Sequence, residues 1–311
     1  MLYDAQLPGS VLVLGAQGRG EIEAINDFGF ETIVSDLDFA ARLDEVARKR
    51  RRTVDVHLKF DTGMGRIGFH VEQAIKVVRR LAELPALSVI GVMTHLACSD
   101  EKSGEEFTRE QVRLFTSLRQ TLEAINFRIP LWHASNSGGL LQYPQARFDA
   151  VRPGIAMYGS HPSPETARLP GLREAMTLKT RLAQVRNVQQ GMTVSYGCTW
   201  TAMRPSRIGV LPIGYADGWN RASSNKGHAL VRGRRVSFVG RVCMDMIMVD
   251  VTDVPGAAEG DEAVLLGAQG KERISIEEVA ALLGTVPQAV TTSLTARVPR
   301  LYKGGEAKKK A

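Results

Sequence analysis

Cysteine is scarce in this sequence, which has only three such residues among 311, at Cys98, Cys198 and Cys243. No two of them form a Cys-x-x-Cys pair, and an odd, widely spaced set does not suit a disulfide framework or a zinc site. The sequence also has no apolar run of the roughly 18 residues that a membrane span needs. No basic region precedes the short apolar stretch 11–14, so we expect no signal peptide and a cytoplasmic protein.

Aromatic residues are also few, at 6% of the chain, whereas the net charge is +7. The densest basic run, 48–52, follows an apparent amphipathic helix over 40–47, and cations at a helix C-terminus interact favourably with the helix dipole. No aromatic residue interleaves with this run. We therefore interpret it as a solvated helix end rather than a nucleic-acid surface, which needs a binding motif as well as charge. We expect neither a nucleic-acid nor a membrane partner.

The first half of the chain alternates short apolar or β-branched runs with segments of helical periodicity, a pattern typical of parallel βαβ units. Strands are predicted over 11–14, 32–34, 54–60, 88–93, 129–133 and 149–152. Helices are predicted over 21–28, from about 36, over 71–84, from about 104 to 125, and over 136–141. A closed barrel needs eight strand-helix units. The strand count alone therefore leaves two folds open, an incomplete (β/α) barrel and an open doubly wound sheet.

From about residue 177 strands dominate, separated by glycine-rich turns. They are predicted over 177–188, 207–212, 228–231, 235–239, 244–251 and 262–266. One helix is predicted among these strands, over 275–283. Ser275 and Glu278 form a capping box at its start, and Gly284 follows its end. The loose proline-containing stretch 162–164 precedes the boundary. We predict an α/β domain over residues 1–171 and a mainly β domain over 172–311.

The densest group of chemically active residue types lies at 56–68, where a predicted strand runs into a glycine-rich loop. Lys59, Asp61 and Arg66 stand at or after the carboxyl end of this strand, and α/β folds bind ligands at that end of the sheet. Glycines let the backbone approach a ligand, and arginine is a permanently charged, oriented donor. Taken alone, the same residues also suit a tight turn with a surface salt bridge.

Polar clusters follow three more predicted strands. Thr94 and His95 end one strand, the segment 133–139 follows another, and Arg152 and Gly154 follow the last. The Ser and Gly residues of 133–139 open a helix, and a helix N-terminus of this kind binds anions. A single histidine here is more often a satisfied core residue. Four polar strand ends together nevertheless indicate a binding site, and the last strands of a barrel commonly supply a phosphate site.

Three glycine-flanked segments are prominent in the second half, at 194–197, 212–218 and 240–246. The first contains Tyr196 and the second contains Tyr215. Each tyrosine is compatible with a hinge or core position as well as with a functional one. A tyrosine becomes a usable base only where positive charge lowers its pKa, so a functional tyrosine needs a cationic neighbour.

Taken together, these segments closely resemble the alanine racemases, from about Val11 to Tyr302, in the family's motif order and approximate spacing. The resemblance implies an incomplete (β/α)8 TIM-type barrel of about six strands that binds the cofactor, followed by a β domain with the catalytic tyrosine. It also implies pyridoxal 5'-phosphate as cofactor and interconversion of L-alanine and D-alanine, which supplies D-alanine for peptidoglycan. Family members are homodimers whose active sites are made by both subunits.

The resemblance assigns roles to residues of this sequence, and none of them is a metal ligand. Tyr196 matches the tyrosine that removes or returns the α-proton on one face of the substrate, reaching into the partner's barrel. Arg66 matches the arginine near the cofactor's phenolic oxygen and the substrate carboxylate. Lys59 matches a position that is often carbamylated in the family, and the carbamate can then orient Arg66. Arg152 matches the arginine on the pyridine nitrogen, which stays unprotonated beside a permanent cation. The other matches are His95 in the tyrosine's supporting network, the phosphate cradle of Asn136, Ser137, Gly154 and Ile155, the substrate-carboxylate segment at Met244 with Cys243 and Asp245, and the entry corridor of Asp100, Tyr215, Arg221 and Arg241.

Two departures from the family pattern affect the expected activity. Ala296 stands where many members carry a tyrosine that contacts the phosphate. The family's Lys-Ala-Asn-x-Tyr-Gly-like motif has no counterpart in this sequence, because the stretch 11–14 matches the third barrel strand. The lysine of that motif binds the cofactor covalently and acts as the second base. We therefore expect weak cofactor binding and no racemase activity of this chain as it stands, since only Tyr196 remains as a base.

Two other interpretations stay open. One is a non-catalytic protein of the same fold that binds pyridoxal phosphate or has a regulatory role. Retention of Tyr196 and Arg152 weighs against it, because a mere binder does not need a proton-transfer tyrosine. The other is a racemase of broader specificity or a related decarboxylase. The motifs Val-Ser-Tyr-Gly and Gly-Tyr-Ala-Asp-Gly favour a racemase.

Overall fold

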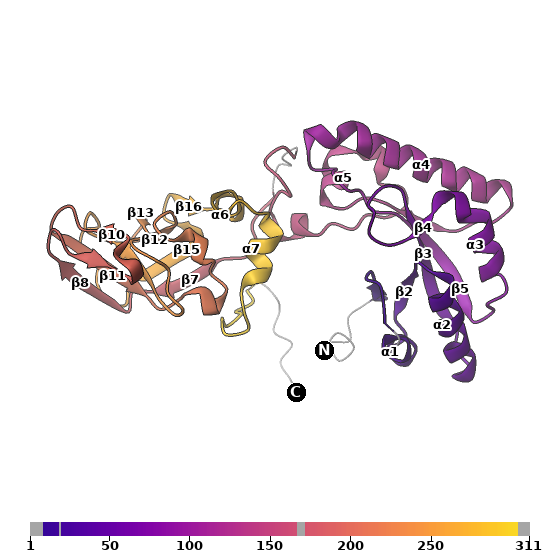
Figure 1. Cartoon of the computed structure of the whole chain (residues 1–311), viewed down its shortest axis with the longest axis horizontal. Helices are drawn as coiled ribbons and strands as arrows, with labels where there is room; N and C mark the ends of the chain where they lie inside the picture. Colours follow the sequence, from indigo (N-terminus) through magenta and orange to yellow (C-terminus); the bar gives the residue numbers. More distant parts are fainter. Residues whose placement is uncertain (1–8, 19, 167–171, 304–311) are drawn as a thin grey trace. The chain divides into compact units, whose positions relative to one another are not determined.

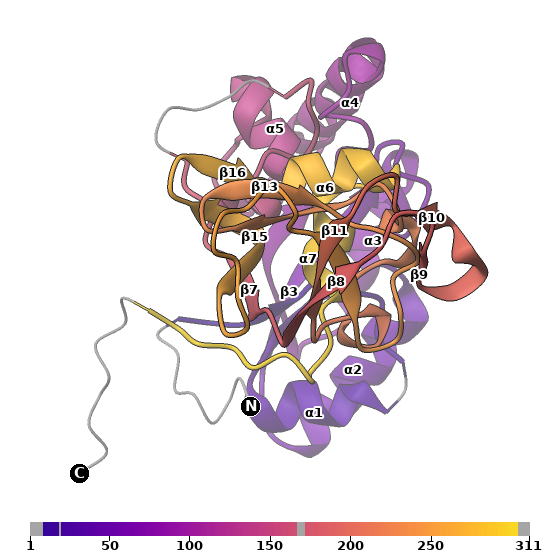
Figure 2. The ribbon, with the colours of Figure 1, turned by 90° about the vertical axis from the view of Figure 1, so that its left-hand side faces the viewer.

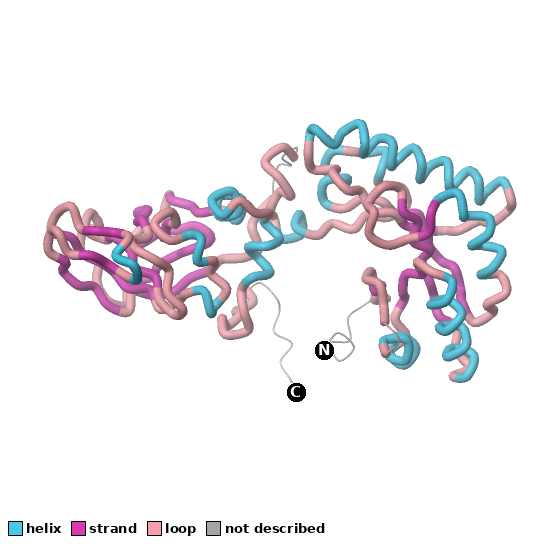
Figure 3. The backbone as a smooth tube through the Cα atoms, in the orientation of Figure 1, coloured by secondary structure: helices cyan, strands magenta, loops and turns pink. Residues whose placement is uncertain are grey.

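The structure is a computed structural model of the chain, in which residues 9–18, 20–166 and 172–303 are described. It divides into two compact units, one comprising Met1–Gly154 with Glu165–Leu169 and the other Ile155–Pro164 with Pro170–Ala311. Helices and strands alternate in the first unit, whereas strands dominate the second (Figures 1 and 3). Within the described residues, no helix is both long enough and apolar enough to cross a membrane.

The first unit is built on a parallel sheet with the strand order β1-β2-β3-β5-β6, and β4 pairs with β3. Its strands are β1 (Leu12–Val13), β2 (Glu31–Val34), β3 (Val54–Asp61), β4 (Phe69–His70), β5 (Leu87–Met93) and β6 (Leu131–His133). Its helices are α1 (Glu21–Phe28), α2 (Leu37–Lys49), α3 (Ala74–Leu81), α4 (Glu105–Ala124) and α5 (Ser137–Gln142), with short 3-10 turns η1 (Val71–Gln73), η2 (Lys102–Gly104) and η3 (Pro144–Ala146).

The strands predicted in this half are confirmed except the last. Residues 149–152 pair with β6 only through a single bridge between Ala150 and His133. Phe148, just before them, has a positive φ of 46°, and Pro153, just after them, has no N–H to donate to a ladder. A regular strand therefore cannot extend in either direction. The sequence does not predict β4, because two residues are too few to show an alternating pattern.

One face of the sheet is apolar and covered by helices. Side chains alternate in direction along a strand, and Val56, Leu58 and Phe60 of β3 pack into the core beneath the helices. The buried Trp132 of β6 lies in the same core, edge-on to Phe115 of α4 with 5.2 Å between the ring centroids. Figure 1 shows α2, α3 and α4 along this side of the sheet. Burial of these apolar groups is the main favourable contribution to folding of the unit.

The opposite face of the sheet carries polar side chains. Glu31, His57, Lys59 and His133 alternate along their strands with the apolar residues of the core. Three of them, His57, Lys59 and His133, are buried. A buried polar group is costly unless a partner satisfies it, so these side chains need one another or their neighbours. The alternation thus separates an apolar face that packs against the helices from a face that carries ionisable side chains.

The strands of the second unit are antiparallel and form sheets with the orders β10-β9, β14-β11-β8 and β13-β12-β15-β16, with β7 paired to β15 (Figure 2). The strands are β7 (Leu178–Arg181), β8 (Gln184–Val188), β9 (Thr193–Val194), β10 (Trp200–Thr201), β11 (Ser206–Leu211), β12 (His228–Val231), β13 (Arg234–Ser237), β14 (Ile247–Asp250), β15 (Glu262–Gln269) and β16 (Glu272–Ile274). The helices are α6 (Ile276–Leu283) and α7 (Pro287–Ser293), with 3-10 turns η4 (Ile155–Tyr158), η5 (Tyr196–Cys198), η6 (Tyr215–Asp217) and η7 (Arg221–Ser223).

The single strand predicted over 177–188 is wrong, because the chain breaks between β7 and β8. Leu182 is buried in the core of the unit, and its N–H donates to the Asp261 carbonyl at 2.9 Å. The next N–H, of Ala183, donates to the Val210 carbonyl at 2.8 Å. The chain therefore passes at this point from the sheet that contains β15 to the sheet that contains β11.

Helix α6 confirms the predicted helix at 275–283. Ser275 Oγ accepts from the Glu278 N–H, and Gly284 ends the helix with a φ of 63°. Helix α7 is not predicted by the sequence. Pro287 suits its first turn, but the Val and Thr residues that follow are weak helix formers, so the pattern alone does not reveal a helix.

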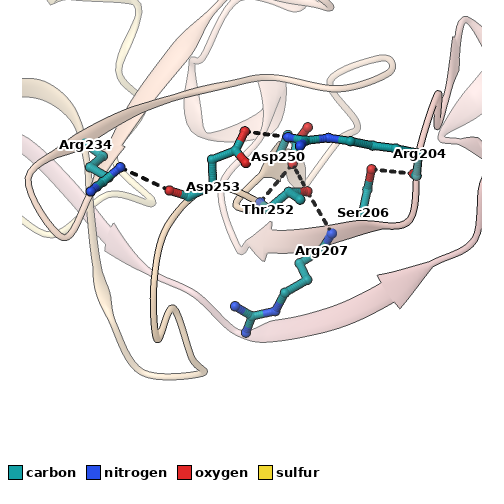
Figure 4. A network of polar contacts seen from close by, with 7 residues as sticks. All are labelled: Arg204, Ser206, Arg207, Arg234, Asp250, Thr252 and Asp253. Carbon is teal, nitrogen blue, oxygen red and sulfur yellow. Dashed lines mark hydrogen bonds and ion pairs between the residues drawn. The ribbon is translucent and has the colours of Figure 1, made fainter.

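A polar network fixes the turn after β14 (Figure 4). Asp250 Oδ1 accepts from the Thr252 N–H, and Thr252 Oγ1 accepts from the Arg207 N–H, each at 2.9 Å. The Asp253 carboxylate accepts from the guanidinium of Arg204. These contacts tie the end of β14 to β11 and to the segment that precedes β11.

Candidate functional site

One carboxylate shapes the glycine-rich loop that follows β3. Asp61 accepts hydrogen bonds from the N–H groups of Gly63, Met64 and Gly65 at 2.7–2.9 Å. Burial alone raises the pKa of Asp61, but these three backbone donors bring it below its ordinary value. Gly63 and Gly65 have φ values of 133° and 67°, which residues with a Cβ rarely adopt. The loop conformation thus depends on an ionised Asp61 and on glycine.

Lys59 is a buried cation on the polar face of the sheet, only 2% exposed. Its Nζ donates to the Phe60 carbonyl at 3.3 Å. Burial lowers the pKa of Lys59 to about 8, with Asp61 opposing this shift and Arg152 and Arg66 adding to it. An ordinary lysine has a pKa of about 10.4. Lys59 therefore has a much larger neutral fraction near neutral pH than a surface lysine has.

Arg152 joins the ends of β5 and β6. Its Nη1 donates to His133 Nδ1 at 2.7 Å, and its Nη2 donates to the carbonyls of Thr94 and Ala134 at 2.8 and 3.0 Å. Nη2 also lies 3.4 Å from His95 Nδ1. Burial lowers the pKa of Arg152 to about 10, so the guanidinium remains charged at neutral pH. The cation therefore has a fixed direction at the carboxyl ends of the strands.

The two histidines beside Arg152 are neutral. Burial lowers the pKa of His133 to about 3 and that of His95 to about 4, and the charge of Arg152 adds to both shifts. A neutral imidazole accepts through one ring nitrogen and donates through the other. The guanidinium of Arg152 thus lies beside two uncharged rings.

A buried glutamine of α4 ties two strand ends together. Gln111 Nε2 donates to the His95 carbonyl at 3.1 Å and to Thr62 Oγ1 at 3.3 Å. Thr62 Oγ1 in turn lies 2.8 Å from Thr94 Oγ1. These bonds fix the end of β3 against the end of β5. The sequence does not predict a role for Gln111, because its partners come from distant strands.

Asn136, predicted as part of a phosphate cradle, uses its side chain within the protein. Its Oδ1 accepts from the Gly139 N–H at 2.9 Å and from Ser99 Oγ at 2.7 Å. Its Nδ2 donates to the Leu96 carbonyl at 3.1 Å. Asn136 is therefore the N-cap of α5 and the link between this helix and the loop after β5.

We expect Asn136→Ala to lower the free energy of unfolding of the first unit by about 1–2 kcal/mol, because the N-cap acceptor is lost. Urea unfolding followed by the fluorescence of Trp132 measures this, in a background where Trp200 and Trp219 of the second unit are replaced by Phe. The matched control is Asn136→Asp, which keeps an N-cap acceptor and should lose less. Unchanged stability of Asn136→Ala would contradict the capping role.

The other predicted cradle residues come from two segments, Ser137 at the start of α5 and Gly154 with Ile155 after Arg152. Ser137 Oγ accepts from the Gly154 N–H at 2.9 Å, which brings the start of α5 against the segment after Arg152. Ile155 is buried and belongs to the second unit. Their assignment to phosphate binding stays a prediction.

Tyr196 lies on an exposed, strained turn of the second unit. Its side chain is 69% exposed, and the flanking Ser195 and Cys198 have φ values of 69° and 49°, which cost free energy in residues other than glycine. Ser195 Oγ donates to the Arg241 carbonyl at 2.7 Å. A Cβ on Gly197 would lie 3.0 Å from Arg241 Cζ. The turn is thus packed against Arg241 and presents Tyr196 outward.

A cavity of about 460 Å³ lies beside Tyr196. Its walls are one face of β8 and β11, the turn at Ser195 and Tyr196, and residues Cys243, Met246 and Met248. Ser195 Oγ lies 3.5 Å from Cys243 Sγ. The volume falls within the range of small-molecule pockets.

The predicted residues Met244 and Tyr215 belong to two segments that pack backbone to backbone. The Tyr215 N–H donates to the Cys243 carbonyl at 3.1 Å, and the Ala216 N–H donates to the Met244 carbonyl at 3.0 Å. A Cβ on Gly214 would lie 2.3 Å from both carbonyl oxygens, so this approach requires glycine. The side chains of Met244 and Tyr215 are exposed. The structure therefore brings these two predicted residues together.

Four other predicted residues are described here only by their exposure. Arg66 is exposed in the loop after β3, and Arg221 and Arg241 are exposed in the second unit. Asp100 is half-buried in the first unit. Their predicted roles in substrate binding and in the entry corridor stay predictions.

The sequence predicts no role for Glu31 or His57, and it places His133 at the start of the polar segment 133–139 that follows a predicted strand. The two-residue period of a strand offers a signal, because His57 precedes Lys59 by two positions and shares its face. Among the described residues, no group of three or more His, Cys, Asp or Glu side chains is arranged to hold a metal ion.

The chain matches the family models of the alanine racemase N-terminal domain over residues 2–162 and C-terminal domain over 175–302. The alanine racemase of Desulfosudis oleivorans is 42% identical over 307 residues, which are 96% of this chain and 78% of the relative. That of Carboxydothermus hydrogenoformans is 40% identical over 302 residues, 97% of this chain and 82% of the relative. The solved alanine racemase from D-cycloserine-producing Streptomyces lavendulae has a TM-score of 0.91 and 34% identity, over 98% of this chain and 80% of that one.

The parallel sheet with its helices is thus an incomplete (β/α)8 barrel, and a β domain follows it, which confirms the predicted fold class. The protein is an isomerase, the enzyme class of the relatives that share these two domains. It belongs to the alanine racemase family.

Proposed function

We propose that this protein is an alanine racemase with alanine as its substrate and pyridoxal 5'-phosphate as its cofactor, and that its 311 residues supply one of the two bases that interconversion of L-alanine and D-alanine needs. We further propose a cytoplasmic homodimer whose product supplies peptidoglycan synthesis. The observation that carries the proposal is Arg152, a half-buried cation held by two strand ends, at the position to which the family resemblance assigns the pyridine-nitrogen arginine.

The residues of the first unit fit this cofactor. Arg152 is a directed donor that cannot deliver its proton to a ring nitrogen, so that nitrogen would stay unprotonated. Ser137 and Gly154 meet at the start of α5, where backbone N–H groups suit a phosphate. Pyridoxal phosphate, when bound, would withdraw electrons from the substrate α-carbon and so ease the loss of its proton.

Tyr196 would take up and return that proton through its phenolic oxygen. Its outward position on the turn suits a side chain that reaches into the barrel of a second copy, which supports a homodimer with shared sites. A phenol acts as a base only beside positive charge. The cations of the first unit, Arg66 and Arg152, would supply that charge in the assembled dimer.

Racemisation needs a second base on the opposite face of the α-carbon. The 311 residues contain no Lys-Ala-Asn-x-Tyr-Gly-like motif. We therefore propose that a chain of these residues alone does not racemise alanine. With Tyr196 as its base, it should exchange the α-proton of one enantiomer and return a proton to the same face.

The test is to incubate the 311-residue chain with pyridoxal phosphate and each enantiomer of alanine in D₂O. Proton NMR follows exchange at the α-carbon, and chiral chromatography follows the enantiomer. We expect exchange of one enantiomer without a change of hand. Formation of the opposite enantiomer would refute the proposed inactivity. Cofactor binding without exchange of either enantiomer would favour the non-catalytic alternative.

We also propose that Lys59 is carbamylated. Its neutral Nζ would attack CO₂, an N–C bond would form, and one proton would pass to water, leaving an anionic carbamate able to orient Arg66. Since the pKa of Lys59 is about 8, the reactive neutral amine increases as the pH rises towards that value. With ¹³C-bicarbonate we expect a carbamate signal that grows between about pH 6.5 and about pH 8.

Lys59→Arg should abolish this carbamate signal, because a guanidinium does not react. The matched control is Lys49→Arg, since Lys49 is an exposed lysine in an ion pair with Glu45. That variant should keep the signal. A signal that persists in Lys59→Arg would assign the modification to another amine.

A further inference from the structure

A line of four side chains crosses the polar face of the first unit and ends on Arg152. Glu31 Oε2 lies 3.2 Å from His57 Nε2, and His57 Nδ1 lies 2.9 Å from His133 Nε2. His133 Nδ1 in turn accepts from Arg152 Nη1 at 2.7 Å. His57 and His133 are only 1% and 2% exposed. The line therefore connects a carboxylate to the guanidinium through two rings that water does not reach.

A glycine makes this line possible. Strand β5 lies between β3 and β6, so the two histidines come from strands that do not pair. His57 stands in register with Gly91 of β5, and a Cβ on Gly91 would lie 2.1 Å from His57 Nδ1. The missing side chain leaves room for the His57 ring to pass over β5. It meets the His133 ring edge-on, with 5.0 Å between centroids.

Only one arrangement of protons satisfies every contact while the rings are neutral. Arginine only donates, so His133 Nδ1 accepts and the His133 proton sits on Nε2. This N–H donates to His57 Nδ1, and the His57 proton therefore sits on Nε2 and donates to Glu31. Each link then has one donor and one acceptor.

Burial is the main reason why both rings are neutral. Burial lowers the pKa of His57, although Glu31 and Asp55 oppose this shift. Burial also lowers the pKa of His133 to about 3, with Arg152 and Lys59 adding to the shift. The proton arrangement above therefore persists across physiological pH.

We infer that Glu31 and His57 are positioning residues that act through His133 to hold Arg152 in the direction in which it meets its ligand. The inference rests on the proposed function only for the identity of that ligand, the ring nitrogen of the cofactor. Without the Glu31 carboxylate, the His57 Nε2–H loses its acceptor. If His57 then moves its proton to Nδ1, His133 must also reverse, and an N–H of His133 would face the N–H of Arg152. A change at Glu31 is thus passed on to Arg152.

The test reads the tautomers directly in the 311-residue chain without cofactor. Long-range ¹H–¹⁵N NMR of ¹⁵N-histidine distinguishes Nδ1–H from Nε2–H rings, and His57→Gln and His133→Gln assign the two signals. In the wild type we expect both rings as Nε2–H from about pH 7 to about pH 8, above the ordinary histidine pKa. In Glu31→Leu we expect His57 and His133 both to lose this single state. Glu31→Gln is the matched control, because its amide oxygen can still accept and should preserve the wild-type tautomers.

Two outcomes would overturn the inference: an Nδ1–H tautomer of either ring in the wild type, or unchanged signals of both rings in Glu31→Leu. A second variant, Gly91→Ala, should displace His57 and change the tautomer signals of both rings while Glu31 is intact. Glu31 is the first residue of β2 and is only half-buried, so its variants should fold, which Trp132 fluorescence verifies. The tautomer measurement involves neither cofactor nor turnover. A negative result in the exchange experiment therefore does not affect it. Unexpected tautomers, in turn, would contradict the positioning role of Glu31 and His57 without contradicting the racemase proposal.

Discussion

Between about pH 7.5 and about pH 5 the first unit is expected to lose about 4 kcal/mol of its free energy of unfolding. The cause is the pair of neutral histidines beside Arg152, whose pKa values are about 3 for His133 and about 4 for His95. The unfolded chain binds a proton on each ring below the ordinary pKa of 6.5, whereas the folded chain does not. At pH 5 each ring therefore contributes about 2 kcal/mol in favour of unfolding, since one pKa unit is worth about 1.4 kcal/mol.

The sign follows from the direction of the shifts. For a histidine whose folded pKa is lowered, stability is fully present above the unfolded pKa and is lost as the pH falls towards the folded value. His57 is shifted in the same direction and adds to the loss. Asp61 is also stabilising only when ionised, but its ordinary pKa of 3.8 places its contribution below this pH window.

Urea unfolding at several pH values, followed through Trp132 in the background without Trp200 and Trp219, measures this loss. Near pH 5, two rings that stay unprotonated in the folded chain make the free energy of unfolding change by about 2.7 kcal/mol per pH unit. His133→Gln should reduce this slope to about 1.4 kcal/mol per pH unit. The matched control is His70→Gln, which removes an exposed histidine outside the contacts of Arg152. A stability that does not vary over this range would show that the two rings are charged in the folded protein.

The variant Tyr196→Phe is expected to slow α-proton exchange by about 10²–10⁴-fold, the usual contribution of a positioned acid or base. It removes the phenolic oxygen and keeps the ring. Because that ring is 69% exposed, the free energy of unfolding of the second unit should change by less than about 0.5 kcal/mol. The rate should fall at saturating substrate, since the lost group acts on the proton and not on substrate binding.

The matched control is Tyr215→Phe, which makes the same chemical change on another exposed tyrosine of the second unit. We propose that Tyr215 lines the entry corridor, so its loss should reduce the rate by less than about tenfold, far below the effect of a proton-transfer group. Equal losses in the two variants would mean that the phenol groups act through packing or access. In that case Tyr196 would not be the base.

Local chemistry explains which parts of the fold could be predicted from the sequence. The parallel strands of the first unit, the helix N-cap at Ser275 and the glycine loop at 63–65 all follow from short-range patterns of one segment. The strand at 149–152 could not be excluded by such a pattern. Its failure depends on the conformation of Phe148 and on the bridge between Ala150 and His133, which form only in the folded sheet.

The contacts of the candidate site residues depend on partners that are distant in the sequence. Asn136 was recognised as a hydrogen-bonding residue at a strand end, whereas its partners Leu96 and Ser99 lie about 40 residues away and use both ends of its amide. The role of Glu31 and His57 depends on strand register. The register of β3 against β5 shifts between Val56 and His57, and a shift of one residue moves every side chain to the other face. No pattern within one strand reveals such a shift.

The position of the His57 ring over Gly91 has a consequence for how this protein can vary. A methyl group at position 91 and an imidazole at position 57 compete for one volume, so a single substitution at position 91 should be rejected while His57 is present. The two positions are therefore expected to change as a pair. In a library randomised at positions 57 and 91, functional clones with histidine at 57 should almost always carry glycine at 91. Functional clones with a larger residue at 91 should carry a smaller side chain at 57.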